Sequence, residues 1–254
     1  MERKPILESL IAKKKQGIKS IAVLIDPDKI VSSADLEILL NACLREEIDY
    51  IFVGGSLLVK GTIGEVIETV KSRVSIPTVL FPGNSLHIDE SADAILFLSL
   101  ISGRNPDLLI GQHVSAAPIL KRSALEVMPT GYILVANDQT TTVAHISQTS
   151  PIPTNKSDIA ICTAMAGEML GMGLIYLDAG SGASEVVPGK MIRGVREAVD
   201  IPLIVGGGIN TKEKAEHAMI NGADLVVIGT AIEENGSFLS EVSAVRNQFN
   251  AIHS

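Results

Sequence analysis

Eight short apolar runs recur along the chain, and they constrain its fold more than any other feature. They are rich in Val, Ile and Leu without strict alternation, which is typical of strands buried on both faces of a parallel sheet. The runs cover residues 21–26, 50–55, 77–83, 94–100, 131–136, 174–180, 202–208 and 225–232. Because helical patterns such as 33–47 and 210–223 lie between most of them, the sequence predicts an α/β protein, a (β/α)8 TIM barrel, as one domain over residues 1–254. A doubly wound open sheet is the alternative, although it would usually have fewer strands.

Two of the connections have unusual lengths. The third and fourth runs begin at residues 77 and 94, only 17 residues apart, whereas a crossover helix normally needs about a dozen residues beyond the strand itself. The third helix is therefore predicted to be missing or reduced to a turn, which would leave a gap in the outer ring that can become a groove. Residues 138–158 are polar and are predicted to form a long loop, either a functional flap or an interface segment.

Smaller signals bear on the helices and on the class of protein. Asn210 is a candidate N-cap for the helix at 210–223, and Gly222 is its predicted stop. Cys43 and Cys162 lie in helical patterns and are predicted to be buried thiols in a reducing compartment. The net charge of −8 argues against a nucleic-acid partner. Since no signal peptide or run of about 18 apolar residues is evident, we expect a cytoplasmic protein without a transmembrane segment.

Glycines cluster after the seventh and eighth runs, the loops that often bind phosphate in such barrels. Gly206, Gly207 and Gly208 let the backbone approach an anion with its N–H groups exposed. Gly229 and Thr230 offer the same, with a hydroxyl donor and the start of a short following helix. Glycines at strand ends are also common turn residues, but two clusters in adjacent loops favour a phosphate site.

The sixth run ends in YLDAGSGA, which places further polar groups beside these loops. Gly180, Ser181 and Gly182 extend the phosphate-facing loop, while Tyr176 and Asp178 have the same parity and can both point into the barrel mouth. Because a carboxylate repels phosphate, Asp178 is better suited to accept a proton or hydrogen bond from a substrate hydroxyl. A capping role for Asp178 is the alternative.

The first two runs end in residues that suit a hard cation. Asp26 and Asp28 flank Pro27, and Ser56 follows the second run, so carboxylate and hydroxyl oxygens for Mg²⁺ would meet at the mouth. A polar turn explains the two aspartates almost as well. No lysine stands at the end of a run, which argues against a Schiff-base aldolase. The five histidines are scattered and have no zinc spacing.

With LIDPDK, VGGS, YLDAGSGA, VGGGI and VIGTAI in this order, the chain resembles the geranylgeranylglyceryl phosphate synthases and the related heptaprenylglyceryl phosphate synthases. The resemblance spans nearly the whole chain and implies a barrel that lacks its third helix. It also implies prenyl transfer from geranylgeranyl diphosphate (C20) to the 3-hydroxyl of sn-glycerol 1-phosphate, with an apolar channel for the tail. The family further suggests a dimer or hexamer, for which residues 114–120 are a candidate interface, with an ordinary core helix as the alternative. Because prenyl diphosphates are amphipathic, transient membrane contact is also expected.

The resemblance assigns roles to individual residues. Mg²⁺ would be held by Asp26 and Ser56, and Asp178 would be the catalytic residue. Glycerol 1-phosphate would be bound by Tyr176, Leu177, Asp178, Ala179, Gly180, Ser181, Gly182, Gly206, Gly207, Gly229 and Thr230. Many members have Glu in place of Asp178, and some have Lys where this chain has Leu24, which puts a phosphate contact from that side in doubt. A sugar-phosphate isomerase or epimerase, with a small polar pocket, and a non-catalytic barrel that binds a phosphorylated metabolite are the alternatives.

Overall fold

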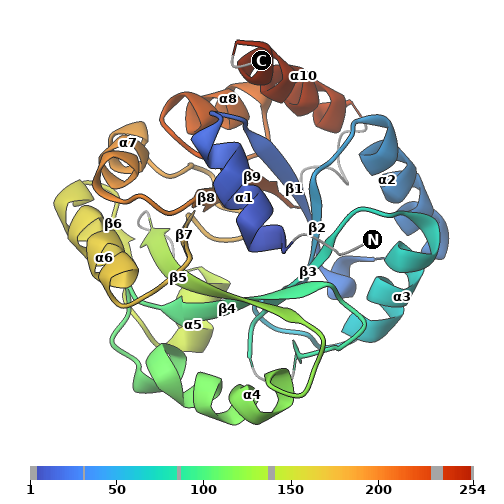
Figure 1. Cartoon of the computed structure of the whole chain (residues 1–254), viewed down its shortest axis with the longest axis horizontal. Helices are drawn as coiled ribbons and strands as arrows, with labels where there is room; N and C mark the ends of the chain where they lie inside the picture. The colour runs from blue at the N-terminus through green and yellow to red at the C-terminus, as the bar shows by residue number, and fades with distance from the viewer. Residues whose placement is uncertain (1–4, 31, 85–86, 137–140, 230–236, 253–254) are drawn as a thin grey trace.

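Eight parallel strands close into a ring at the centre of the molecule (Figure 1). The computed structural model describes residues 5–30, 32–84, 87–136, 141–229 and 237–252. The ring consists of β1 (Ser20–Ile25), β2 (Tyr50–Gly55), β3 (Thr78–Pro82), β4 (Ala94–Leu100), β5 (Glu126–Ala136), β7 (Leu174–Asp178), β8 (Leu203–Gly206) and β9 (Leu225–Ile228). Each strand pairs with the next in this order, and β9 pairs with β1. The predicted (β/α)8 barrel is therefore confirmed.

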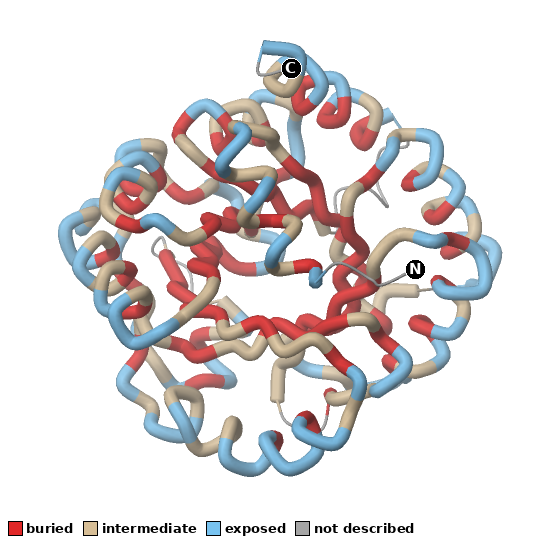
Figure 2. Tube along the Cα trace, in the orientation of Figure 1, coloured by how far each residue is buried: buried red, intermediate tan, exposed pale blue. Residues whose placement is uncertain are grey.

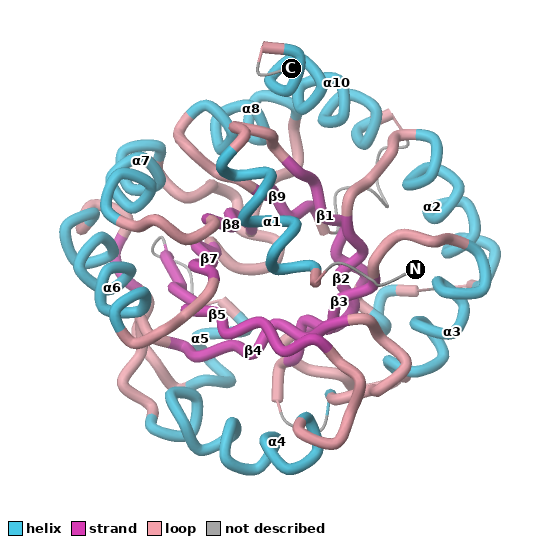
Figure 3. The backbone as a smooth tube through the Cα atoms, viewed as in Figure 1, coloured by secondary structure: helices cyan, strands magenta, loops and turns pink. Residues whose placement is uncertain are grey.

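Helices surround the ring of strands (Figure 3). Among the described residues they are α2 (Ser33–Arg45), α3 (Ile63–Arg73), α4 (Gln112–Leu120) with the preceding π-helical turn η3 (Asp107–Gly111), α6 (Ser157–Met169), α7 (Gly189–Ala198), α8 (Lys212–Ile220) and α10 (Phe238–Ala251). A short 3-10 turn, η1 (Pro27–Lys29), follows β1. No described helix is long and apolar enough to cross a membrane.

The third outer helix is missing, as the short spacing of the runs predicts. The described residues between β3 and β4, 83–84 and 87–93, contain no α-helix. Thr78 holds this connection short, because its carbonyl accepts from the Asp93 N–H at 2.9 Å and its own N–H donates to the Asp93 carboxylate at 2.9 Å. The outer ring of helices therefore has a gap between α3 and α4 (Figure 1).

The alternation of side chains along each strand separates two apolar layers. The strands themselves are the mostly buried inner part of the tube in Figure 2. On β1, Ile21, Val23 and Ile25 pack outward against the helices, whereas Ala22 points into the barrel. The same parity directs Leu24, and after it Asp26, toward the barrel mouth. The position of a polar residue after a strand thus follows from the apolar pattern within the strand.

The helix α1 (Ile6–Lys15) closes the end of the barrel at which the strands begin (Figure 1). Its buried Ile6 and Leu10 join the apolar cluster inside the barrel. The Glu126 carboxylate, at the start of β5, accepts the N–H groups of Ile6 and Leu7, the latter at 2.9 Å. These N–H groups have no partner within the helix, so Glu126 caps α1 and fixes it in place. The opposite end of the barrel remains for a binding site.

The described part of the segment 138–158, residues 141–158, is not the continuous loop that its polarity predicts. It contains α5 (Thr142–Ser147) and the two-residue strand β6 (Ile152–Pro153), which pairs with Val135 and Ala136 of β5. The Thr141 hydroxyl caps α5 by accepting the Ala144 N–H at 3.1 Å. The apolar residues here are too few for a periodic pattern, so capping and strand pairing determine the local structure.

Two smaller predictions are wrong in part. The N-cap of α8 is Thr211, whose hydroxyl accepts the Lys214 N–H at 3.3 Å, and not Asn210. Gly222, with φ +115°, does follow the end of α8 as predicted. Cys43 is buried, and burial raises the pKa of its thiol to about 12, but Cys162 is exposed. On α6 the buried positions are Ala160, Ala164 and Gly167, and the helical period places Cys162 on the outer side.

Candidate functional site

A cavity of about 430 Å³ opens at the ends of the strands opposite α1. It collects the loops after β1, β2, β7, β8 and β9, which is where the sequence predicts a site. Its lining includes Asp26, Ser56, Tyr176, Asp178, Ser181, Gly182, Gly207, Gly208 and Gly229. Most of the predicted site residues are thus brought together around one space.

The loops after β7 and β8 approach each other closely because they are built from glycine. Gly207 has φ +79°, and a Cβ there would lie 2.4 Å from Asp178 Oδ1 and 2.6 Å from the Gly180 nitrogen. A Cβ at Gly206 would lie 2.4 Å from the Tyr176 hydroxyl oxygen. Only glycine fits at both positions, and Gly207, Gly208, Gly180 and Gly182 all have positive φ angles. A backbone of this kind can present N–H groups to an anion as a nest.

Two glycines border open space. A Cβ at Gly182 or at Gly229 would meet no heavy atom within 4 Å, so the absence of a side chain there leaves room for a ligand. Ser181 and Gly182 are exposed at the rim of the cavity. Thr230 and the predicted start of a following helix lie outside the described residues.

Some predicted residues lie beside the cavity without facing it. The Leu177 and Ala179 side chains pack in the outer apolar layer, because their parity is opposite to that of Tyr176 and Asp178. Gly180 and Gly206 do not line the cavity: the Gly180 N–H donates to the Asp178 carboxylate at 2.8 Å, and Gly206 packs against the Tyr176 side chain. Ligand binding by Leu177 and Ala179 stays a prediction, which would involve their backbone.

Asp178 is a buried carboxylate with two hydrogen-bond donors. One oxygen accepts the Gly180 N–H at 2.8 Å, and the other accepts the hydroxyl of Tyr132. Burial raises the pKa of the Asp178 carboxyl, while the Tyr132 hydroxyl and then the Gly180 N–H oppose this rise. A carboxylate with a raised pKa, at the edge of a cavity, is suited to take a proton from a ligand hydroxyl.

Three aromatic rings stand beside Asp178. The ring centroids of Tyr132 and Tyr176 are 5.3 Å apart, and Phe81 lies 5.5 Å from Tyr176 and 6.2 Å from Tyr132. Burial raises the pKa of both tyrosine hydroxyls well above the ordinary value, with the Asp178 charge adding to it, so both remain protonated. Sequence reasoning missed Tyr132. Tyr132 lies opposite Tyr176 in the pairing of β5 with β7, and this relation cannot be read from the sequence until that pairing is known.

The two aspartates after β1, Asp26 and Asp28, have different surroundings and hydrogen-bond partners. Asp26 lines the cavity, and burial is the largest effect on its carboxyl, raising the pKa, while Lys29 lies 3.9 Å away. Asp28 instead accepts the N–H groups of Val59, Lys60 and Gly61 at 2.7–2.9 Å, and these bonds lower the pKa of its carboxyl. These bonds hold Asp28 against the loop after β2, whereas Asp26 lines the cavity, so metal binding by Asp28 stays a prediction.

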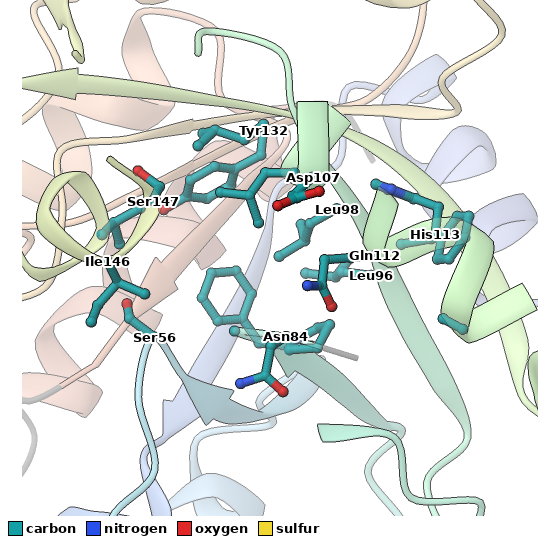
Figure 4. Close-up of a pocket in the computed structure, with 18 of the residues that line it drawn as sticks. Ser56, Asn84, Leu96, Leu98, Asp107, Gln112, His113, Tyr132, Ile146 and Ser147 are labelled. Atoms are coloured by element: carbon teal, nitrogen blue, oxygen red, sulfur yellow. The ribbon is translucent and has the colours of Figure 1, made fainter. Parts of the chain in front are cut away.

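A second cavity of about 420 Å³ adjoins the first and is mostly lined by apolar side chains (Figure 4). Its apolar lining includes Phe81, Ile88, Ile95, Leu96, Phe97, Leu98, Leu108, Ala116, Val143 and Ile146. Leu96 and Leu98 come from the inner face of β4, and Ile95 and Phe97 come from its outer face. The cavity thus passes from the barrel mouth to the outer side, beside the gap left by the missing helix. Gly55, Ser56, Leu57, Phe81 and Val143 line both cavities and join them.

The chain is similar to known proteins over nearly its whole length. Residues 13–246 match the model of the PcrB family. Geranylgeranylglyceryl phosphate synthase of Spirosoma linguale is 52% identical, over 93% of this chain and 95% of that protein. The namesake from Pyrococcus furiosus is 44% identical, over 85% of each chain. The crystal structure of (S)-3-O-geranylgeranylglyceryl phosphate synthase from Thermoplasma acidophilum, in complex with substrate sn-glycerol-1-phosphate, superposes with a TM-score of 0.89 at 31% identity, covering 98% of this chain and 99% of that one.

Proposed function

The chain belongs to the PcrB family, and from this premise we propose that it transfers a geranylgeranyl group (C20) from its diphosphate to the 3-hydroxyl of sn-glycerol 1-phosphate. The product is an ether-linked glycerol phosphate, and diphosphate leaves. The relatives that carry the name geranylgeranylglyceryl phosphate synthase, and the neighbour that binds sn-glycerol-1-phosphate, support this activity.

The continuity of the two cavities is the observation that carries the proposal. A polar cavity with a glycine nest suits a small phosphorylated alcohol, and an apolar cavity that continues from it suits a prenyl tail. Ser56 and Phe81 stand at the junction, where the reacting carbon of the donor would meet the acceptor. A sugar-phosphate isomerase would need only the polar cavity, so the apolar extension argues against that alternative.

Asp178 is the residue that we propose to act on the acceptor. Its carboxylate lies at the polar cavity and is held by Tyr132 and Gly180, so its position does not depend on the ligand. As the new C–O bond forms, the attacking hydroxyl becomes acidic, and Asp178 takes its proton. The faces of Tyr132, Tyr176 and Phe81 offer electron-rich surfaces beside the allylic carbon, which carries positive charge as the diphosphate departs.

The glycine loops would hold the phosphate of the acceptor. N–H groups of a nest bind an anion without a side-chain charge, and the open space at Gly182 and Gly229 is large enough for the oxygens to approach. Because Gly207 touches both Asp178 and Gly180, the same loops that bind the phosphate also set the distance to the proton acceptor.

The residues at the end of β1 and β2 fit a magnesium ion. Asp26 offers a partly buried carboxylate, and Ser56 offers a hydroxyl in the same cavity. Among the described residues no group of three or more His, Cys, Asp or Glu could hold a metal by itself, so diphosphate oxygens and water would complete the coordination, as is usual for Mg²⁺. When bound there, Mg²⁺ would neutralise the charge of the leaving diphosphate. Asp26→Asn should raise the Mg²⁺ concentration for half-maximal rate roughly tenfold, whereas Asp35→Asn, at an exposed helix start, should not change it.

The activity is tested by incubating the protein with Mg²⁺, sn-glycerol 1-phosphate and radiolabelled C15, C20 or C35 diphosphate in separate reactions. We expect an organic-extractable phosphate product, formed fastest from C20 and abolished by EDTA. If none of the three donors gives a product, the proposed activity is wrong, and binding of glycerol 1-phosphate alone would then point to a phosphometabolite-binding barrel.

We also propose that the chain self-associates through α4. This helix buries Ala116 and Leu120, as an ordinary core helix does, but it exposes 65% of Val114 and 39% of Ile119. Exposed apolar side chains of this kind are more stable when covered. Light scattering after gel filtration should give a mass above that of one chain, and Val114→Glu should lower it; a monomeric wild type would refute the proposal.

A further inference from the structure

Lys214 lies where the two glycine loops meet, and it bonds to both. Its ammonium donates to the carbonyl of Ser184 at 3.0 Å, to the carbonyl of Gly208 at 3.1 Å and to the Asn210 side-chain oxygen at 2.7 Å. Ser184 follows β7, whereas Gly208 and Asn210 follow β8. A lysine ammonium has three protons, so all three of them join these loops.

The carbonyl groups around Gly208 create a local electrostatic problem for a phosphate site. A Cβ at Gly208 would lie 2.7 Å from the carbonyl oxygens of both Ala183 and Glu185, so these oxygens lie close to Gly208, whose own carbonyl is an acceptor of Lys214. Carbonyl oxygens that lie close together repel each other and also repel an anion bound nearby. The Lys214 ammonium, bonded to the Ser184 and Gly208 carbonyls of the same loops, offsets both effects.

The charge of Lys214 is not matched by a carboxylate. Its three acceptors are neutral oxygens, and none of the salt bridges in the described part of the chain includes it. Lys29, which lines the polar cavity, differs because it lies 3.9 Å from Asp26. Gly208 and Asn210, which Lys214 contacts directly, both line the polar cavity. A full positive charge therefore lies immediately behind the glycine loops.

We propose that Lys214 is a positioning residue that makes the acceptor site selective for a phosphate dianion. It holds the loops after β7 and β8 in register and supplies the positive charge that the nest itself lacks. The inference rests on the proposed function, since it takes glycerol 1-phosphate to be the acceptor. It predicts that loss of the charge weakens binding of this acceptor and leaves binding of the prenyl donor unchanged.

Steady-state kinetics with each substrate varied in turn tests the proposal. Lys214→Gln keeps a hydrogen-bond donor without the charge, and Lys214→Met removes both. We expect each to raise KM for glycerol 1-phosphate by roughly tenfold or more, the effect of losing one close charge interaction, with kcat and the donor KM within about twofold of wild type. Lys214→Arg should restore most of the affinity. Lys212→Met, on the same helix without these three bonds, is the matched control and should resemble wild type.

Calorimetric binding of glycerol 1-phosphate gives a readout that does not need turnover. The difference in Kd between wild type and Lys214→Gln should shrink as salt rises, because salt screens a charge interaction. An unchanged acceptor KM, or an equal loss for both substrates, would overturn the proposal, as would two uncharged variants that are unfolded at 25 °C by circular dichroism. A wild type that binds glycerol 1-phosphate but transfers no prenyl group would instead contradict the proposed function.

Discussion

Replacing Asp178 by Asn separates its chemical role from its structural one. The two side chains have nearly the same shape, but Asn has one acceptor oxygen where Asp178 accepts from both Tyr132 and Gly180. One of these buried donors loses its partner, which costs about 1–3 kcal/mol. Removal of a buried negative charge offsets part of this cost, since burial disfavours the charged form. A domain of this size changes its Tm by about 2–4 °C per kcal/mol, so we expect a shift of only a few degrees.

The expected loss of activity is much larger. General-base catalysis contributes about 10²- to 10⁴-fold to a rate, so kcat of Asp178→Asn should fall at least about a hundredfold. KM for glycerol 1-phosphate should change far less, because the glycine loops remain. The assay is prenyl transfer at saturating concentrations of both substrates, with thermal unfolding measured on the same preparations. Turnover of the Asp178→Asn variant within about threefold of wild type would refute the role of Asp178 as a base.

The pH dependence gives a second, independent measurement. Burial raises the pKa of Asp178, so the wild-type rate should decline on the acid side at a pH above the ordinary carboxyl range. Tyr132→Phe removes the hydrogen bond that favours the charged form, and the decline should move to higher pH. Asp178→Asn should have no such decline. The charge on Asp178 has the opposite effect on the free energy of unfolding to the charge of a carboxylate in an ion pair. Because its pKa is raised in the folded state, the charged carboxylate lowers the free energy of unfolding at pH values above its ordinary pKa. This loss of stability disappears at lower pH.

Other contacts can be tested one at a time. Gly207→Ala should abolish binding of glycerol 1-phosphate in calorimetry, because the new Cβ would lie 2.4 Å from Asp178 Oδ1 at φ +79°; binding of normal affinity would contradict the nest. Leu98→Trp should fill part of the apolar cavity and shift the preferred donor from C20 toward C15 in competition assays, and an unchanged preference would place the tail elsewhere. His87 accepts the Gly83 N–H at 3.0 Å, and burial lowers the pKa of its ring. The contribution of His87 to the free energy of unfolding should therefore be largest above the ordinary histidine pKa and should fall as the pH drops below it. His87→Phe, although less stable overall, should show a smaller fall in urea unfolding between pH 7 and 5, and an equal fall would refute this origin.

The fold was predictable where the sequence contains long periodic signals. The eight runs correspond to the eight strands of the ring, and the short interval between residues 77 and 94 correctly predicts the missing helix. The segment 138–158 was not predictable in the same way. Its helix α5 has only six residues and begins at the Thr141 cap, and its two-residue strand β6 depends on pairing with β5, which no local pattern records.

The candidate site was predictable to the extent that it follows from strand parity and glycine content. Asp26, Tyr176 and Asp178 face the cavity because they share parity with inward-facing residues. Tyr132 was missed, because its relation to Asp178 depends on the pairing of β5 with β7 across 46 positions of sequence. The partners of Asp28 were missed for a similar reason: they lie in a loop more than 30 residues away.

The ring of strands is not equally strong around its circumference. β3 and β4 are in register over two residue pairs, Val79 with Ala94 and Leu80 with Ile95, whereas β4 and β5 are in register over seven. Where the outer helix is missing, the barrel therefore has a weakly paired seam, formed by β3 and β4. Backbone amides at this seam should exchange with deuterium sooner than those of β4 and β5, since local opening there breaks few bonds. The missing helix that makes room for a prenyl tail would thus also leave the barrel wall weakest between β3 and β4. A long, branched prenyl chain could then enter by local opening there, while the other strands stay paired.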